Sequence, residues 1–387
     1  MYSEEDLNSA VAAGALSAES AAAFRAHMSQ VRDMPRGDEE NFRLINSFND
    51  IFVAIGVVIM LLAAGAIGQA IGGAIVPPLP WPGEDASEAA WKAFYAHDGV
   101  RDGVQTMLAG LLVALTAWPL AEFFTRRRRM ALPSIIMLLA FVGGLFATVL
   151  GVGLALVEGG NDRLGAIVVS IAALLAAGGA WVHWKRFMVP ITIAAGSAAL
   201  AGTAIALVVA AIGPDTVEDP ETLLLSLVFV AGLGIFAFAM RWDISDRERT
   251  TRRSDVAFWL HLLAAPMIAH PIFALLGVTD GGEIGVGAAV GVLAVYVAFG
   301  LLALAIDRRA LLVSALAYVL IALTFLFDRF GAVELTFALT ALVIGSALLT
   351  LSAFWTPIRH TVVRGLPDGW RERLPVTGPV TGSPATA

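Results

Sequence analysis

The stretch IFVAIGVVIMLLAAGAIGQAIGGAI, residues 51–75, contains no charged side chain. A helix rises about 1.5 Å per residue, so roughly 20 apolar residues cross the hydrocarbon core of a bilayer. Nine further apolar blocks follow, separated by short polar segments, near residues 104–124, 132–157, 164–184, 187–212, 222–240, 256–277, 284–306, 309–327 and 333–355. The sequence therefore predicts an all-α fold: a polytopic integral membrane helix bundle of about ten transmembrane helices.

The composition agrees with lipid as the surrounding medium. The chain has 387 residues, of which 58% are hydrophobic and 15% charged, and its mean hydropathy is +0.78. Soluble domains carry about a quarter charged residues. There is no cysteine, which excludes disulfides, thiolate metal sites and thiol catalysis. We predict contact with the lipid bilayer, no cofactor and no nucleic-acid partner.

The basic residues predict the orientation. An even number of spans places both termini on one side of the membrane. If that side is the cytosol, 21 of the 25 Lys and Arg residues lie in cytosolic segments, and only Lys92, Arg101, Arg163 and Arg329 lie outside. Lys and Arg are enriched in cytosolic loops. We therefore predict a protein integral to the plasma (inner) membrane with both termini in the cytosol.

The polar ends divide the chain into three predicted regions. Residues 1–41 form a cytosolic helical hairpin and linker, residues 42–358 the ten-span transmembrane domain, and residues 359–387 a cytosolic tail. The last dozen residues are rich in Thr, Gly and Pro, and the tail is therefore predicted to be largely disordered.

Local signals define the N-terminal hairpin. Gly14 suits the end of a first helix over 4–13, and Ser17 suits the start of a second over 18–31. Helical spacing gives the pair one apolar face, too small for an independent core, formed by Leu7, Val11, Phe24 and Met28. We predict that this face is buried against the bundle or against a protein partner.

One long loop is predicted on the outer side, over residues 76–103. It begins VPPLPWP, which prevents a helix, and a short separate helix is expected over 85–96. The aromatic residues Trp81, Trp91 and Tyr95 suit the headgroup layer.

Three segments carry a family resemblance: YSEEDL at 2–7, GALSAE at 14–19 and FRLINSFNDI at 42–51. They resemble uncharacterised bacterial membrane proteins of the domain-of-unknown-function 2157 type. The likeness covers about the first 75 residues. It implies a small cytosolic hairpin attached to a multi-span bundle, and it implies no activity and no functional residues.

The seventh predicted span contains the main candidate site, FWLHLLAAPMIAHP at residues 258–271. His261 and His270 are the only histidines deep in a span, and Pro266 and Pro271 accompany them. An ionisable side chain within a bilayer usually faces the bundle interior, a water cavity or a partner. We therefore predict an intramembrane polar site at His261, Pro266, His270 and Pro271, in which His270 faces inward and contacts a polar group or a water-filled cavity.

The spacing of the two histidines limits their chemistry. Nine residues put the rings on opposite faces and about 13.5 Å apart along a straight helix, so they cannot share a metal ion. Two alternatives remain, a proton-responsive pair or two structurally hydrogen-bonded rings. Glu122 is expected to pair with the arginines that follow it, and Gly68 with Gly72, like Gly287 with Gly291, has the spacing that lets helices approach closely.

Two functions are compatible with these features. The first is a small-molecule or proton-coupled carrier that uses the seventh span. The alternative is a non-catalytic membrane sensor, anchor or assembly factor, which binds a protein partner through the N-terminal hairpin. An enzyme is not favoured, because no set of acid, base and nucleophile is visible.

Overall fold

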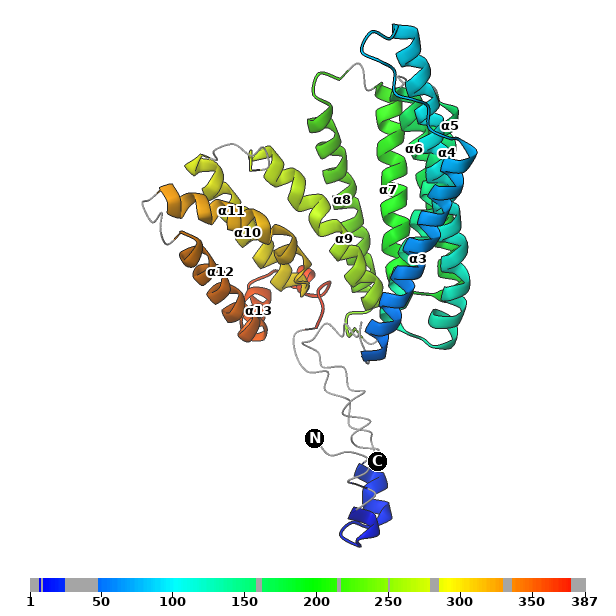
Figure 1. The fold of residues 1–387 in the computed structure, drawn as a ribbon. Helices are drawn as coiled ribbons and strands as arrows, with labels where there is room; N and C mark the ends of the chain where they lie inside the picture. Colours follow the sequence, from blue (N-terminus) through cyan, green and yellow to red (C-terminus); the bar gives the residue numbers. More distant parts are fainter. Residues whose placement is uncertain are drawn as a thin grey trace.

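The computed structural model describes residues 7, 10–24, 48–157, 162–213, 217–249, 251–278, 285–329 and 336–376. These residues form an all-α protein (Figure 1). The elements in chain order are α3 (Phe48–Ile75), α4 (Glu88–Ala121), the π-helix η1 (Glu122–Arg127), α5 (Ala131–Leu156), α6 (Asp162–Phe187), α7 (Ile191–Ile212), α8 (Pro220–Ile244), α9 (Arg252–Leu275), α10 (Val286–Ile306), α11 (Ala310–Arg329), α12 (Thr336–Ala353), α13 (Trp355–Arg364) and α14 (Asp368–Arg371).

Nine of the described helices are long and apolar enough to cross a membrane, and a bent pair, α12 with α13, could supply a tenth span. Large apolar side chains such as Leu62 in the middle of α3 are exposed, as expected for a surface that contacts lipid. The chain is therefore a multi-pass helical membrane protein. The bend of 76° between α12 and α13 lies at Phe354, where the predicted tenth span ends.

Consecutive helices pair into antiparallel hairpins whose short turns lie at one end of the bundle (Figure 1). We call this end the basic end and define it by the turns 128–130, 188–190, 245–251 and 307–309. Each turn contains one non-glycine residue with a left-handed backbone, and these are Arg129, Met188, Arg249 and Asp307. A left-handed residue reverses the chain directly after a helix, so each hairpin closes within a few residues.

On the other side of the bundle, the predicted break inside the 76–103 loop is absent. Residues 85–96 and the second predicted span belong to one continuous helix, because α4 begins at Glu88 and Ser87 caps it through the backbone N–H of Ala90. Trp81 and Trp91 pack edge to face with ring centroids 5.2 Å apart, and Tyr95 stacks on Trp91. Trp91 and Tyr95 therefore lie on the first turns of a long α4, and Trp81 packs against them from the preceding loop.

Glycines bring α3, α4 and α5 into direct backbone contact. A Cβ added at Gly68 would lie 2.6 Å from the Cα of Ala109, which confirms the close approach expected there. Between α4 and α5 the contact is reciprocal, since a Cβ at Gly110 would lie 2.6 Å from the carbonyl oxygen of Gly144, and one at Gly144 2.7 Å from that of Gly110. The pair in the eighth predicted span behaves differently, because Gly287 has no neighbour within 4 Å.

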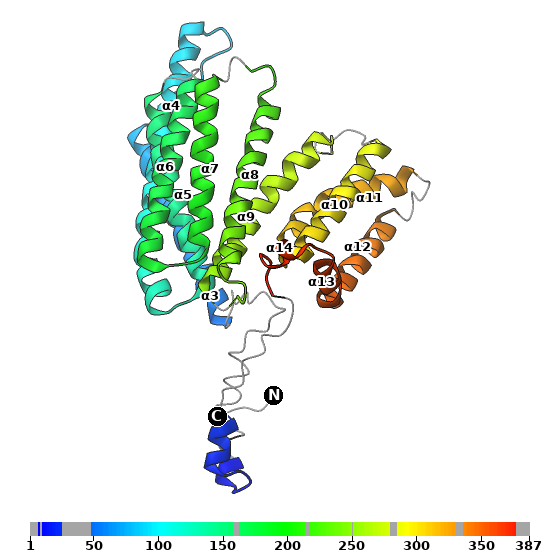
Figure 2. The same cartoon turned by 180° about the vertical axis from the view of Figure 1, so that it is seen from behind.

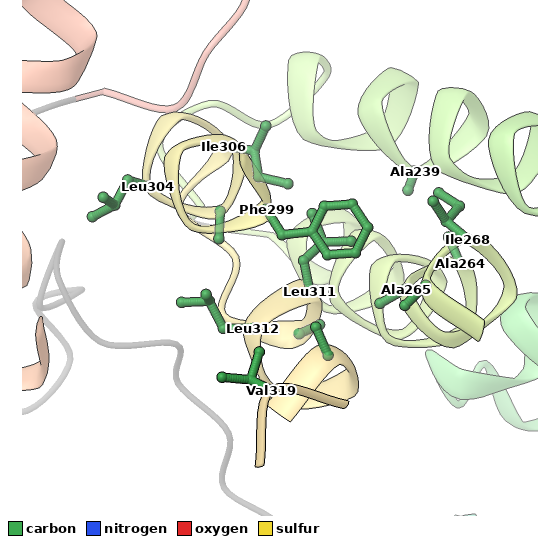
Figure 3. Packing of buried hydrophobic residues seen from close by; sticks show 14 of the residues in the cluster. Ala239, Ala264, Ala265, Ile268, Phe299, Leu304, Ile306, Leu311, Leu312 and Val319 are labelled. Atoms are coloured by element: carbon green, nitrogen blue, oxygen red, sulfur yellow. The ribbon is translucent and has the colours of Figure 1, made fainter. Parts of the chain in front are cut away.

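The buried side chains separate the described helices into two groups. Two apolar clusters hold α3–α7 together, and a larger one joins α8–α13 and also includes Ala194 of α7. In the larger cluster, Phe299 of α10 and Leu311 of α11 point toward the alanines of α9 (Figure 3). Figures 1 and 2 show α10–α12 inclined to α3–α7. Trp259 of α9 packs against a cluster of each group, and α7 contributes Ile191 to one cluster and Ala194 to the other, so the two groups meet along α7 and α9.

The N-terminal segment is described only in part. Gly14 has φ +70°, and the backbone N–H of Ser20 donates to the Ser17 hydroxyl at 3.0 Å, as expected for the end of one helix and the start of the next. Leu7 and Val11 are half-buried, Phe24 is 39% exposed, and Met28 lies outside the described residues. Within this chain the predicted face is therefore only partly covered.

The C-terminal segment continues the fold beyond the predicted boundary at residue 358. That boundary divides α13, and Arg359 is 3% exposed. Residues up to Val376 are described, and Leu374 is buried. The tail is held here because the buried Arg359 and the half-buried Arg247 bind its backbone, an arrangement that composition alone does not reveal. Residues 377–387 lie outside the described part of the chain.

The α4–α5 contact generates a stability prediction with a neighbouring control. Gly144→Ala places a methyl group against the α4 backbone, and such overpacking costs roughly 1–3 kcal/mol. Gly143→Ala meets nothing within 4 Å. We expect thermal unfolding of the purified protein in detergent to show a lower midpoint for Gly144→Ala and an unchanged or higher one for Gly143→Ala. Equal midpoints would contradict a tight α4–α5 contact.

Candidate functional site

Helix α9 carries all four residues of the predicted polar site. Thr251 caps it by accepting the backbone N–H of Arg253, and the helix continues through Pro266 and Pro271 to Leu275. Pro271 is buried and Pro266 exposed. More than half of the most apolar 18 residues of α9 are buried, 56% against at most 39% in the other eight candidate spans. The helix is therefore central to the bundle.

His261 belongs to a buried charged cluster near the basic end. Its Nε2 lies 2.8 Å from Oδ2 of Asp243 in α8, and Nη2 of Arg308 donates to the other carboxylate oxygen at 2.6 Å. The same Arg308 nitrogen donates to the Ser254 carbonyl at 3.0 Å. We call Asp243, His261 and Arg308 the Asp243 cluster. All three side chains are at most 4% exposed.

The hydrogen bonds of the Asp243 cluster favour a neutral imidazole. A carboxylate oxygen only accepts, so Nε2 of His261 must donate to Asp243. Nδ1 is buried and has no hydrogen-bond partner among the described residues. A proton on Nδ1 would therefore be a buried donor without an acceptor, and Arg308 already balances the charge of Asp243. This geometry favours the structural alternative for His261.

A second acidic residue, Asp307, connects this region to α13. It is the left-handed residue that ends α10, and its carboxylate accepts from Arg249 at 2.8 Å and from the indole of Trp355 at 2.7 Å. Burial lowers the pKa of Arg249, and the neighbouring Arg308 acts in the same direction, while Asp307 opposes the shift. Arg359 also approaches Asp307, with Nε 3.6 Å from the carboxylate.

The arginines around Asp307 hold the C-terminal segment. Arg359 donates to the carbonyl oxygens of Pro375 at 2.8 Å and Val376 at 3.2 Å. Arg247 donates to the carbonyl of Leu374 at 2.9 Å. The segment 374–376 thus completes the hydrogen bonds of two guanidinium groups at the basic end.

His270 lies elsewhere, as the nine-residue spacing predicts. Its Nδ1 is 2.7 Å from the hydroxyl of Tyr318 in α11, and the Tyr318 ring stacks on the fully buried Phe273. The predicted polar contact is therefore present. The predicted inward orientation is wrong, because His270 is exposed on the bundle surface. The hydroxyl on the adjacent helix satisfies the ring without burial.

A cavity lies at the basic end, where α9 meets the first helix group. It has a volume of about 510 Å³ and is lined by the end of η1, the starts of α5, α7 and α9, and the end of α6. Its charged lining residues are Arg126, Arg129, Arg186, Arg252 and Asp255. We call it the basic cavity. From the sequence these arginines predicted orientation only, since nothing in their spacing reveals that three turns converge.

Glu122 stands behind the basic cavity and pairs with two of its arginines. Nε and Nη2 of Arg186 donate to the carboxylate at 2.6 and 3.0 Å, and Arg126 approaches at 3.4 Å. The pairing expected within 126–129 is thus confirmed for Arg126, while the shorter contacts come from α6. These hydrogen bonds to Arg186 link the end of α4 to the end of α6.

His183 is a further buried polar residue that the sequence placed at a span end. It is fully buried beside the wall of the basic cavity, with its ring centroid 4.5 Å from that of Phe187 and 6.2 Å from that of Trp118. Neither ring nitrogen has a hydrogen-bond partner among the described residues. An aromatic setting of this kind is invisible in the sequence, because its members come from α4, α5 and α6.

The Asp243 cluster predicts a non-additive loss of stability. Removing one member of a buried ion pair costs about 3–5 kcal/mol, because an unpaired charge remains. We expect Asp243→Asn and Arg308→Met each to lower the thermal midpoint strongly, and the double variant to lose less than the sum of the two. Arg309→Met, at the exposed neighbouring position, is the control and should lose little. Additive losses would show that the two side chains are not coupled.

Within the described ranges, no three His, Cys, Asp or Glu side chains could together hold a metal ion. Comparison with known proteins supplies no further assignment: no family model, no curated protein and no solved structure matches this chain. The resemblance of its N-terminal region to the domain-of-unknown-function 2157 type therefore stays a prediction. The site is defined by its geometry alone, in a multi-pass helical membrane protein.

Proposed function

We propose that this protein is a plasma-membrane carrier for small molecules, with both termini in the cytosol and the basic cavity on the cytosolic side. The uneven division of Lys and Arg supports the orientation, because the basic turns gather at one end of the bundle. The supposed N-terminal hairpin and the segment 374–376 would then lie on the same side as the cavity.

The orientation is tested by labelling. The chain has no cysteine, so Glu84→Cys and Arg127→Cys each introduce a single thiol at an exposed position, one at either end of the bundle. In intact spheroplasts, an impermeant maleimide should label Glu84→Cys and reach Arg127→Cys only after lysis. A reporter fused after Ala387 should behave as cytosolic. The reverse pattern would contradict the proposed orientation.

The observation that carries the carrier proposal is the position of the basic cavity. It opens between α9 and the α3–α7 group, and α9 also belongs to the core of the α8–α13 group. Many carriers place their site where two packed helix groups meet, and move the groups relative to each other around it. A cavity of about 510 Å³ is large enough for a small organic solute.

Proton coupling, if the carrier uses it, is assigned to His270 rather than His261. Each ring has one hydrogen-bond partner, Asp243 for His261 and Tyr318 for His270, but His261 is buried in the Asp243 cluster whereas His270 is exposed. Glutamine can keep the contact with Tyr318 but does not gain a proton near neutral pH. His270→Gln therefore separates a proton-exchanging ring from one that only holds α9 to α11.

The alternative function is a sensor, anchor or assembly factor. It is favoured by the partly uncovered N-terminal segment, in which Leu16 and Phe24 are 38% and 39% exposed. A protein partner that covers these side chains would complete their burial. In that case the transmembrane bundle would serve to place the N-terminal segment at the membrane.

Reconstituted protein distinguishes the two functions. We expect proteoliposomes, tested on a solid-supported membrane with a panel of small organic acids, phosphate esters, amines and sugars, to show a protein-dependent charge movement or flux. Removal of residues 1–40 should leave it unchanged, and His270→Gln should remove any pH dependence while the rate at the optimal pH survives. No flux with any solute class, together with loss of partner binding after the deletion, would favour the anchor.

A further inference from the structure

We infer that the basic cavity is a binding site for a phosphate group, either that of a soluble phosphate ester or that of an anionic phospholipid. This inference deepens the proposed function and relies on it only for the side from which the ligand arrives. The first observation is the charge of the cavity. Even with Asp255 and the paired Glu122 counted, its four arginines leave two positive charges in excess.

The second observation is which arginines lack a partner. At the neighbouring part of the basic end, Arg247, Arg249, Arg308 and Arg359 all donate to carboxylates or carbonyls of the chain. The guanidinium groups of Arg129 and Arg252, by contrast, have no hydrogen bond and no ion pair within 4 Å among the described residues, although the carboxylate of Asp255 acts electrostatically on Arg252. Arginines that only set the orientation of the protein in the membrane do not have to line a cavity, whereas Arg129 and Arg252 do line one. Two unpaired guanidinium groups suit the bidentate recognition of a phosphate.

The third observation is an unsatisfied hydroxyl in the wall. Thr125 is 9% exposed, lines the cavity, and its hydroxyl has no hydrogen-bond partner among the described residues. It lies in the π-helical turn η1, and single π-turns occur often at functional sites. Leaving a buried hydroxyl unpaired is costly, and a ligand oxygen would satisfy it.

Helix ends and apolar side chains complete the match. Both α5 and α7 begin at the cavity without a side-chain cap, so the positive ends of their dipoles favour an anion there. Ile135, Phe187 and Trp259 add an apolar wall. The arrangement therefore fits a phosphate attached to an apolar or amphipathic group better than a free inorganic ion.

The test measures binding to the purified full-length protein, with paired substitutions of equal charge. Arg129→Gln with Arg252→Gln removes the two unpaired cavity arginines. Arg128→Gln with Arg253→Gln removes their sequence neighbours, which are equally exposed but do not line the cavity. One arm measures glycerol 3-phosphate by calorimetry in detergent. The other measures retention of phosphatidic acid by native mass spectrometry after transfer from phosphatidylcholine nanodiscs with and without that lipid.

We expect the cavity pair to weaken binding at least about tenfold in one arm, the loss of a charge-assisted contact, and the neighbouring pair to weaken it less than about threefold. Loss in the first arm identifies a soluble ester and loss in the second a lipid headgroup. Equal effects of both pairs, or binding in neither arm by a wild-type protein with a normal thermal midpoint, would overturn the inference. Solute flux without arginine-dependent binding would contradict only the inferred phosphate site. Arginine-dependent binding without flux would contradict only the proposed carrier function.

Discussion

The carboxylate of Asp243 is the point on which the second half of the bundle depends. It is fully buried, and a buried charge is tolerated only when it is paired and hydrogen-bonded. Its two partners, His261 and Arg308, come from α9 and from the turn after α10. One side chain thereby specifies the relative positions of three elements. The helices are mostly alanine and leucine at their contacts, and such apolar packing alone would tolerate several alternative arrangements.

The arginines of the basic end fall into two groups, those with hydrogen-bond acceptors within the chain and those without. Around Asp243 and Asp307, each guanidinium group finds acceptors within the chain, and the result is a rigid platform. In the basic cavity, only Arg126 and Arg186 share an acid, and Arg129 and Arg252 remain available. The difference lies in the partners, since each arginine of the first region donates to at least one carboxylate or carbonyl of the chain, although Nε of Arg249 and Nε of Arg359 have no hydrogen-bond partner among the described residues. A binding site requires this incomplete satisfaction, because a ligand has to supply the missing acceptor.

The helices could be predicted from the sequence, and much of the site could not. The apolar blocks gave all the long helices, because the hydrocarbon thickness sets their length. Gly68 was identified by spacing, yet Gly110 and Gly144 were not, since their contact depends on which faces α4 and α5 turn toward each other. The tenth span became a bent pair because Trp355 of α13 donates to Asp307 across the fold. The orientation of His270 also differs from the prediction, because its hydrogen-bond partner, Tyr318, lies 48 positions away in the sequence.

The segment 374–376 has a consequence for biosynthesis. The chain emerges from the ribosome in order, so the transmembrane helices are complete before Leu374 is made. Until then, the guanidinium groups of Arg247 and Arg359 lack the carbonyl acceptors that they have in the finished fold. A chain that ends before Leu374 would leave these two guanidinium groups with fewer acceptors, although Arg359 keeps its approach to Asp307. Loss of the segment 374–376, by truncation or by proteolysis, would therefore uncover guanidinium groups at the basic end and weaken the link between the α8–α9 turn and α13.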